Sequence, residues 1–170
     1  MVAFESPLDV DFDGAQFVGD NVAHGALGWI ARDSSKPGRG RSDGQECWVL
    51  QSSPQAAADI ISSIKGRYNV NMVREKAKEV LVHDFLGAIP LLTGGKDIDM
   101  PEIVHVAGHR WGAAFPDSTG EFMQMESQLI ESKTFVACGD YFGTLNGRIE
   151  GAYLSGISAA SQVIDCSKLF

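Results

Sequence analysis

Residues 135–160, FVACGDYFGTLNGRIEGAYLSGISAA, join an apolar strand to a glycine-rich loop and then to a helix of small side chains. The strand-like run Phe135–Cys138 stops at Gly139-Asp140, where the loop begins. A helix is predicted over Glu150–Ile164, and its N-terminus would present free N–H groups and partial positive charge. Its packed side is predicted to be unusually small, because small residues recur every four positions as Gly151/Ser155/Ala159 and Ala152/Gly156/Ala160.

The first third of the chain is predicted to form strands separated by turns. A polar, glycine- and serine-rich stretch, Asp33–Glu46, is predicted to be a long loop between the third and fourth of them. The strand-like segments, which are apolar, aromatic or β-branched, are Met1–Glu5, Ala15–Val18, Leu27–Arg32 and Cys47–Gln51.

The middle of the chain is predicted to form two helices. Ser53-Pro54 is typical of a helix start, because serine caps the first turn and proline tolerates it. Asn71 is the expected cap of the second helix, and Gly87 and Pro90 are expected to end it. The apolar positions repeat at helical spacing in both helices: Ala57, Ile60, Ile61 and Ile64, then Val73, Ala77, Val80, Leu81 and Phe85.

The last third returns to strands, at Ile103–Trp111 and Thr134–Cys138, before the final helix. The order strand, helix, strand, helix predicts an α+β fold with an antiparallel or mixed sheet. We expect two parts, 1–115 and 116–170, the second being a strand–loop–helix segment.

Composition narrows the possible functions. The 170 residues are 44% hydrophobic and 21% charged, which is typical of a globular protein. A net charge of −8 argues against general nucleic-acid binding and against docking on anionic lipid. No apolar run approaches a membrane span, the N-terminus is unlike a signal peptide, and the three cysteines are far apart. We therefore expect a cytoplasmic protein in a reducing compartment.

The 135–160 string resembles the C-terminal flavin-contacting segment of FAD-dependent amine oxidoreductases, in which a strand and Gly-Asp precede an (I/V/M)-E-G-A-x-x-S-G helix. The resemblance implies FAD as cofactor. It places Asp140 along the ribityl–diphosphate and the helix start against the pyrimidine edge of the flavin, where the helix would stabilise reduced flavin. The implied cofactor-binding residues are Gly139, Asp140, Arg148, Ile149, Glu150, Gly151, Ala152 and Tyr153.

Two further stretches are similar to renalase-type enzymes within that group. They are GHRWGAAFP at 108–116 and WIARDSSKPGR at 29–39, the latter followed by ECWVL at 46–50. The resemblance makes residues 1–115 the substrate-binding lobe and residues 116–170 the end of the FAD-binding domain. It implies a substrate pocket that includes His109, Trp111 and Arg39. A buried strand tryptophan is an equally good interpretation of Trp111.

The family's N-terminal βαβ unit with G-x-G-x-x-G does not occur in this sequence, and Gly38–Gly44 has the wrong spacing. We therefore expect the C-terminal half of a renalase-like flavoprotein, partnered by an N-terminal FAD domain or by a second copy. The complete enzyme would take a hydride from a dihydronicotinamide-type or amine-type substrate, with oxygen as acceptor. A non-catalytic remnant or binding module that no longer holds FAD is the alternative.

Three weaker patterns each allow a functional and a purely structural interpretation. Asp9-x-Asp11-x-Asp13-Gly14 partly imitates a calcium loop, but a solvated acidic turn is the favoured interpretation. His105 and His109 are expected to share one face of a strand without a third ligand, so we predict no metal site. A group of basic residues could meet the phosphates of a dinucleotide substrate or simply form a surface loop: Arg32, Lys36, Arg39 and Arg41.

Overall fold

A computed structural model of the chain describes residues 1–18, 25–64, 69–112, 127–129, 135–145 and 147–167. The chain divides into two compact units, Met1–Arg110 and Trp111–Phe170. The sequence places the boundary after residue 115. The first unit is a strand–helix unit and the second a strand–loop–helix unit, so the α+β class is confirmed.

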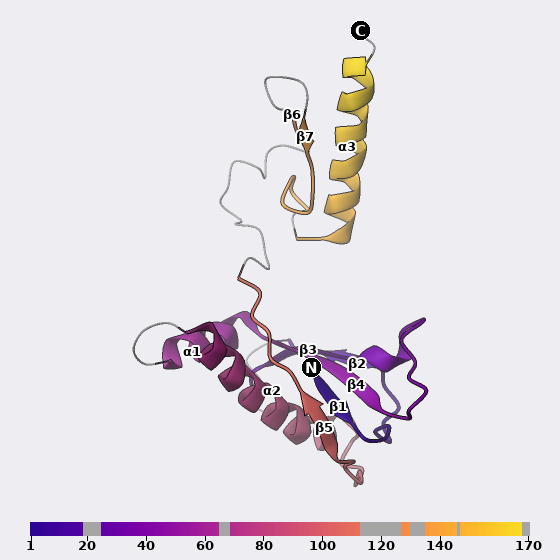
Figure 1. Ribbon diagram of the computed structural model, residues 1–170, viewed down its shortest axis with the longest axis vertical. Helices are drawn as coiled ribbons and strands as arrows, with labels where there is room; N and C mark the ends of the chain where they lie inside the picture. Colours follow the sequence, from indigo (N-terminus) through magenta and orange to yellow (C-terminus); the bar gives the residue numbers. More distant parts are fainter. Residues whose placement is uncertain (19–24, 65–68, 113–126, 130–134, 146, 168–170) are drawn as a thin grey trace. The chain divides into compact units, whose positions relative to one another are not determined.

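The first unit is built on a five-stranded antiparallel sheet in the order β2-β3-β4-β1-β5 (Figure 1). Register pairs Val2 with Trp48 in β4 and with Val106 in β5. The strand bounds are β1 Val2–Phe4, β2 Gly14–Gln16, β3 Leu27–Arg32, β4 Glu46–Ser52 and β5 Ile103–Val106. A short 3-10 helix, η2 (Asp33–Ser35), opens the long loop between β3 and β4.

Helix α1 (Pro54–Ser63) begins where the sequence predicts. The Ser53 hydroxyl accepts a hydrogen bond from the Ala56 N–H at 3.2 Å, and Pro54 occupies the first turn. Ile60 is the buried residue of this helix. A serine cap of this kind stabilises a helix by about 1 kcal/mol.

Helix α2 (Val70–Leu92) is longer than predicted at both ends. Its cap is Asn69 and not Asn71, since the Asn69 side chain accepts from the Asn71 N–H at 2.9 Å. Pro90 lies inside the last turn, where only one hydrogen bond is lost, and Gly87 does not interrupt the helix. The helix ends instead at the pair Gly94 and Gly95, which adopt positive φ angles of 65° and 85°.

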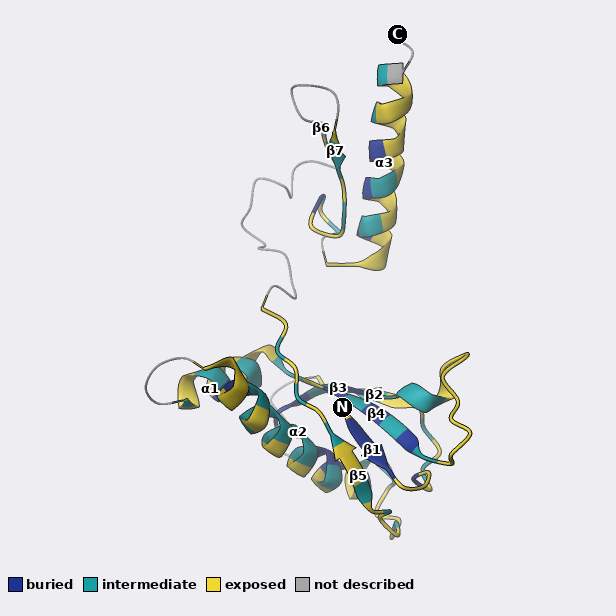
Figure 2. Ribbon diagram, viewed as in Figure 1, coloured by how far each residue is buried: buried dark blue, intermediate teal, exposed yellow. Residues whose placement is uncertain are grey.

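The core of the first unit lies between α2 and one face of the sheet. Trp48 and Phe85 are fully buried, with ring centroids 5.4 Å apart, and Phe4 packs 6.3 Å from Phe85. Val2, Leu27 and Ile30 complete the strand side of this layer. The alternation of buried and half-buried residues along β4 follows the period of two that a strand with one covered face requires (Figure 2).

A carboxylate is buried at one edge of this core. Glu46 is 4% exposed, and its Oε1 accepts from the Trp48 indole at 2.6 Å and from the Leu8 N–H at 3.1 Å. Its Oε2 lies 3.4 Å from Arg32 Nε, and the Arg32 guanidinium sits over the Trp48 ring. Arg32 Nη2 also donates to the carbonyls of Val10 and Phe12. The pair therefore fastens residues 8–12 onto the sheet.

The fifth predicted strand, Ile103–Trp111, is wrong beyond Val106. Ala107 still exchanges backbone hydrogen bonds with Met1, but the ladder stops there. Gly108 lies so close to the Arg74 carbonyl that a side chain would not fit, and the segment leaves the sheet at this contact. His105 and His109 consequently do not share a strand face, because His109 lies outside β5.

The second unit contains a two-stranded sheet and α3 (Ile149–Ser167). β6 (Gln128–Leu129), which the sequence did not predict, pairs with β7 (Val136–Ala137) in antiparallel register. β7 is shorter than the predicted Thr134–Cys138, and Thr134 lies outside the described residues. α3 begins one residue earlier than predicted and extends to Ser167.

Candidate functional site

The region implied as a cofactor site lies where β7 ends and α3 begins. α3 packs through small residues: Gly151 is buried, Ser155 is 2% exposed and Ala159 is 8% exposed. The Ser155 hydroxyl accepts a hydrogen bond from the Gly139 N–H at 3.0 Å. The predicted small packed side is therefore confirmed for this row, whereas Ala160, in the other row, is exposed.

Close packing explains two of the glycines. A side chain at Gly151 would collide with the Leu145 carbonyl, which belongs to the backbone and cannot swing away. A side chain at Gly139 would come within 2.6 Å of the Tyr141 ring, and Gly139 has a φ of 156°. Contacts within the unit therefore require glycine at both positions.

The loop between β7 and α3 is held by its own backbone. Gly147 N–H donates to the Asp140 carbonyl at 2.6 Å, and Phe142 N–H donates to the Gly139 carbonyl at 3.3 Å. Phe142 is 1% exposed and its ring packs on Tyr141 with centroids 4.7 Å apart. A loop anchored in this way presents the Asp140 side chain, which is on an exposed residue, at a defined place.

Of the remaining residues of the implied cofactor site, Ala152 is half-buried and the other four are exposed. Ala152 N–H donates to the Arg148 carbonyl at 3.0 Å, so Arg148 stands immediately before the first helical turn. Ile149 is 91% exposed and Tyr153 67% exposed, and Glu150 is also exposed. The segment from Asp140 to Tyr153 therefore contains an exposed carboxylate, the start of α3 and an exposed phenol ring.

Glu150 changes what that helix start can attract. A carboxylate in the first turn is favourable to the helix because it faces the positive end of the dipole. For the same reason, it offsets part of the positive potential that an anionic ligand would otherwise meet. The segment is therefore better suited to a polar, hydrogen-bonding ring edge than to a free phosphate.

The three residues of the implied substrate pocket are not brought together within one unit. Arg39 lies in the loop that leaves the sheet at the Glu46 end of β4. His109 follows β5 beyond Val106, which pairs with Val2, and so leaves from the opposite end of the sheet. Trp111, which is 77% exposed, belongs to the second unit.

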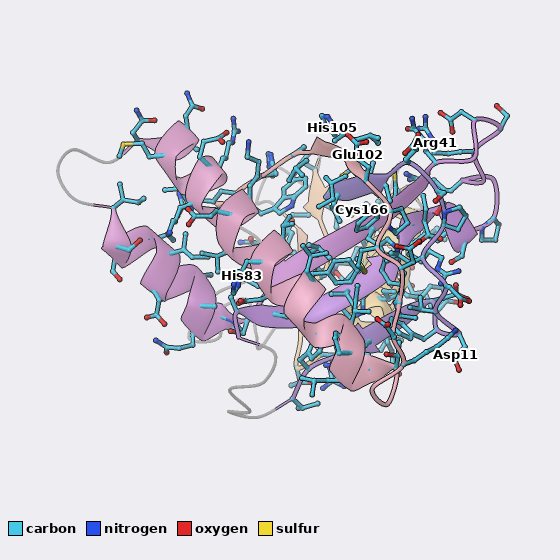
Figure 3. All side chains as sticks on the ribbon, turned by 90° about the horizontal axis from the view of Figure 1, so that it is seen from below. Asp11, Arg41, His83, Glu102, His105 and Cys166 are labelled. Carbon is cyan, nitrogen blue, oxygen red and sulfur yellow. The ribbon has the colours of Figure 1, made fainter. Side chains whose placement is uncertain are left out.

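The cations Lys36, Arg39 and Arg41 of the basic loop are ion-paired within the loop. Asp33 pairs with Lys36 at 2.8 Å and with Arg39 at 3.2 Å, and the hydrogen bond from Lys36 is the main reason that the pKa of Asp33 is lowered. Arg41 pairs with Asp43, so the pKa of that carboxyl is also lowered (Arg41 is labelled in Figure 3). These pairs favour the surface-loop interpretation over a preformed phosphate site.

The acidic turn likewise contributes to ion pairs. Asp9 Oδ2 lies 2.6 Å from Lys96 Nζ, and Asp13 lies 3.6 Å from Arg32. In the described ranges, no three His, Cys, Asp or Glu side chains gather as a metal-binding group. This arrangement matches a solvated acidic turn.

A histidine–aspartate pair on α2 was not singled out from the sequence. Asp84 Oδ2 accepts from the Ala26 N–H at 2.6 Å, and its Oδ1 lies 3.0 Å from His83 Nδ1. The His83 side chain, labelled in Figure 3, is 85% exposed. Adjacent residues on a helix carry no periodic signal, so only the fold shows that Asp84 anchors the start of β3.

No protein-family model matches this chain. Among the helices in the described part of the chain, none is both long enough and apolar enough to cross a bilayer.

Proposed function

We propose that this chain supplies the substrate-binding lobe and the C-terminal strand–loop–helix segment of a renalase-like FAD-dependent oxidoreductase. The proposal rests on the geometry of residues 136–153. There, an anchored Gly-Asp corner and the start of a small-faced helix are locked together by the Gly139–Ser155 hydrogen bond. The same residues carry the sequence resemblance. Its outward-facing members, Asp140, Ile149 and Tyr153, are accessible to a cofactor.

Each residue then has a limited role. Asp140 would accept hydrogen bonds from the ribityl hydroxyls, and the backbone at Glu150 would face the pyrimidine edge. Tyr153 would offer its ring as a flat wall. Bound FAD would accept a hydride from a dihydronicotinamide-type or amine-type substrate and pass the electrons to oxygen. The chain's own part is orientation and electrostatics, so no general base is assigned.

The FAD diphosphate needs further residues in this proposal. The G-x-G-x-x-G element that holds it in the family is not among the 170 residues. The contact would come from an N-terminal FAD-domain partner or from a second copy. We expect weak binding of FAD by this chain alone.

The proposal is tested by titrating the purified chain with FAD and following flavin fluorescence, then recording the visible spectrum after desalting. Saturable binding that Asp140→Asn weakens several-fold, but that Asp97→Asn leaves unchanged, would support it. Asp97 is an exposed aspartate of the first unit and provides the same charge change elsewhere. Binding that is equally strong in both variants, or absent with and without an N-terminal FAD-domain partner, would refute it.

A second candidate is a binding module that keeps the lobe but does not hold FAD. The observation that favours it is that Lys36, Arg39 and Arg41 are already ion-paired within their loop and so form no preformed phosphate site. It predicts no flavin binding under either condition of the same experiment.

A further inference from the structure

An open groove lies along helix α2 within the first unit. Its volume is about 1050 Å³, at the upper end of the size that is typical of small-molecule sites. Its lining follows the helix from Met72 to Leu86, which is about 21 Å at the ordinary helical rise. The apolar side chains of the lining come from both helices and from β5: Ile64, Met72, Val82, Leu86 and Val106. A groove of this length and lining fits an elongated, apolar molecule.

The acidic and basic side chains of the lining are paired with one another. Lys76 Nζ lies 3.0 Å from Glu79 Oε2, and Lys78 pairs with Glu75. A charged ligand would therefore meet no unpaired counter-charge among these four residues. It would also lose part of its hydration against the apolar lining, which is costly for a charge without a partner. The groove therefore favours a neutral ligand.

One polar group of the groove is held in a fixed orientation. His83 Nδ1 lies 3.0 Å from Asp84 Oδ1, and the other Asp84 oxygen accepts from the Ala26 N–H at 2.6 Å. In the neutral imidazole, this contact favours the ring proton on Nδ1, so that Nε2 is a hydrogen-bond acceptor. Among the residues that the structure describes, none is a partner of Nε2. Asn71, the other uncharged polar residue of the lining, lies about 18 Å away along α2.

We propose that this groove binds an elongated, neutral molecule that carries a hydroxyl group, such as a long-chain alcohol. The hydrocarbon chain lies along Val82, Leu86 and Val106, and the hydroxyl donates a hydrogen bond to His83 Nε2. The His83 side chain is 85% exposed, so it stands at the rim of the groove, where a hydroxyl keeps part of its hydration. Burial of the chain supplies the affinity, and the histidine supplies the preference for an alcohol.

This inference does not rest on the proposed function. The groove belongs to the first unit, whereas the FAD proposal rests on residues 136–153 of the second. The experiments use the full chain without FAD, so that failure of one proposal leaves the other standing.

The first test follows the fluorescence of Nile red, a neutral apolar dye, as 1-decanol displaces it from the full chain. We expect saturable dye binding and complete displacement. Leu86→Glu should weaken the binding of both molecules by more than about tenfold, because it places a carboxylate in the apolar lining. Ile157→Glu makes a comparable change at a 49% exposed site on α3 and should leave binding unchanged. No saturable binding, or equal effects of the two variants, overturns the proposal.

The second test isolates the hydroxyl by comparing 1-decanol with its methyl ether, which cannot donate a hydrogen bond. We expect the wild type to bind the alcohol about fivefold more tightly, the value of one ordinary hydrogen bond. His83→Phe keeps a ring without an acceptor and should abolish this preference, whereas His105→Phe, at an exposed position of β5, should preserve it. Both histidines are exposed, so both variants keep the core intact even if Leu86→Glu fails to fold.

Two results of the second test would overturn the proposal. The first is equal binding of alcohol and ether by the wild type, or a preference that survives His83→Phe, since His83 would then not hold the hydroxyl. The second is tighter binding of decanoate or of decylammonium than of 1-decanol, since the groove would then select a charged ligand.

Discussion

Glu46 is the residue whose replacement most directly tests the packing of the first unit. Its carboxylate is 4% exposed and accepts hydrogen bonds from the Trp48 indole and the Leu8 N–H. It also lies 3.4 Å from the Arg32 guanidinium. Glu46→Ala removes the acceptor for both donors and the nearer of the two counter-charges of Arg32 in one step, and Asp13 remains 3.6 Å from Arg32.

The expected loss follows from these contacts. Breaking a buried ion pair by removing one partner costs about 3–5 kcal/mol, and each orphaned donor adds to that cost. The Arg32 side chain, however, is 18% exposed and keeps its bonds to the Val10 and Phe12 carbonyls. We therefore expect the lower end, about 3 kcal/mol. Glu46→Gln keeps an acceptor oxygen in place and should cost about 1 kcal/mol.

The measurement is urea unfolding at pH 7, followed by tryptophan fluorescence and circular dichroism. With an m-value of about 2 kcal/mol per molar urea, Glu46→Ala should lower the midpoint by about 1.5 M. Glu79→Ala removes an exposed carboxylate, which pairs only with Lys76 in the described part of the chain, and should change stability by less than about 0.5 kcal/mol. A Glu46→Gln loss equal to that of Glu46→Ala would show that the shared hydrogen bonds are not what Glu46 contributes.

Three further predictions concern the helices and the basic loop. Ser53→Ala should destabilise the first unit by about 1 kcal/mol in the same urea assay, because the Ala56 N–H loses its cap. Gly151→Ala should loosen the loop before α3, seen as faster amide hydrogen exchange in residues 139–147, whereas Gly156→Ala, with open space around it, should not. Asp33→Asn should cost less than about 1 kcal/mol at pH 7. Because the pKa of Asp33 is lowered in the folded protein, the wild-type advantage is complete above the ordinary value of 3.8 and is lost as pH falls below it; a difference that grows in acid would contradict this.

The strands and helices that the sequence predicted well are those whose signals are local. β3 has the predicted bounds, Leu27–Arg32, because it is an apolar, aromatic run that turns end on both sides. α1 starts at the predicted serine–proline pair, whose two effects both act on the first turn. Their boundaries depend on residues that are adjacent in the chain, so a single sequence suffices to place them.

Elements that end at long-range contacts were placed less well. β5 stops at Val106 because Gly108 meets α2 at Arg74, more than thirty residues earlier in the chain. α2 continues past Gly87 and through Pro90 because Ala88 and Ile89 are buried in the core, and this burial outweighs the cost of one lost hydrogen bond. The buried Glu46 escaped prediction for the same reason, since its partners Leu8, Trp48 and Arg32 are assembled only by the sheet.

The α3 sequence carries two superimposed helical patterns, and only the small-residue pattern was predicted from the sequence. Small residues every four positions predicted a close-packed side, and the structure buries Gly151, Ser155 and Ala159 there. The four-three-four row from Tyr153 to Ile164 lies on the opposite side and was obscured, because in a nearly uncharged helix every side looks apolar. Burial separates the two: the first row packs within its own unit, whereas Tyr153, Ile157 and Ile164 of the second row are exposed.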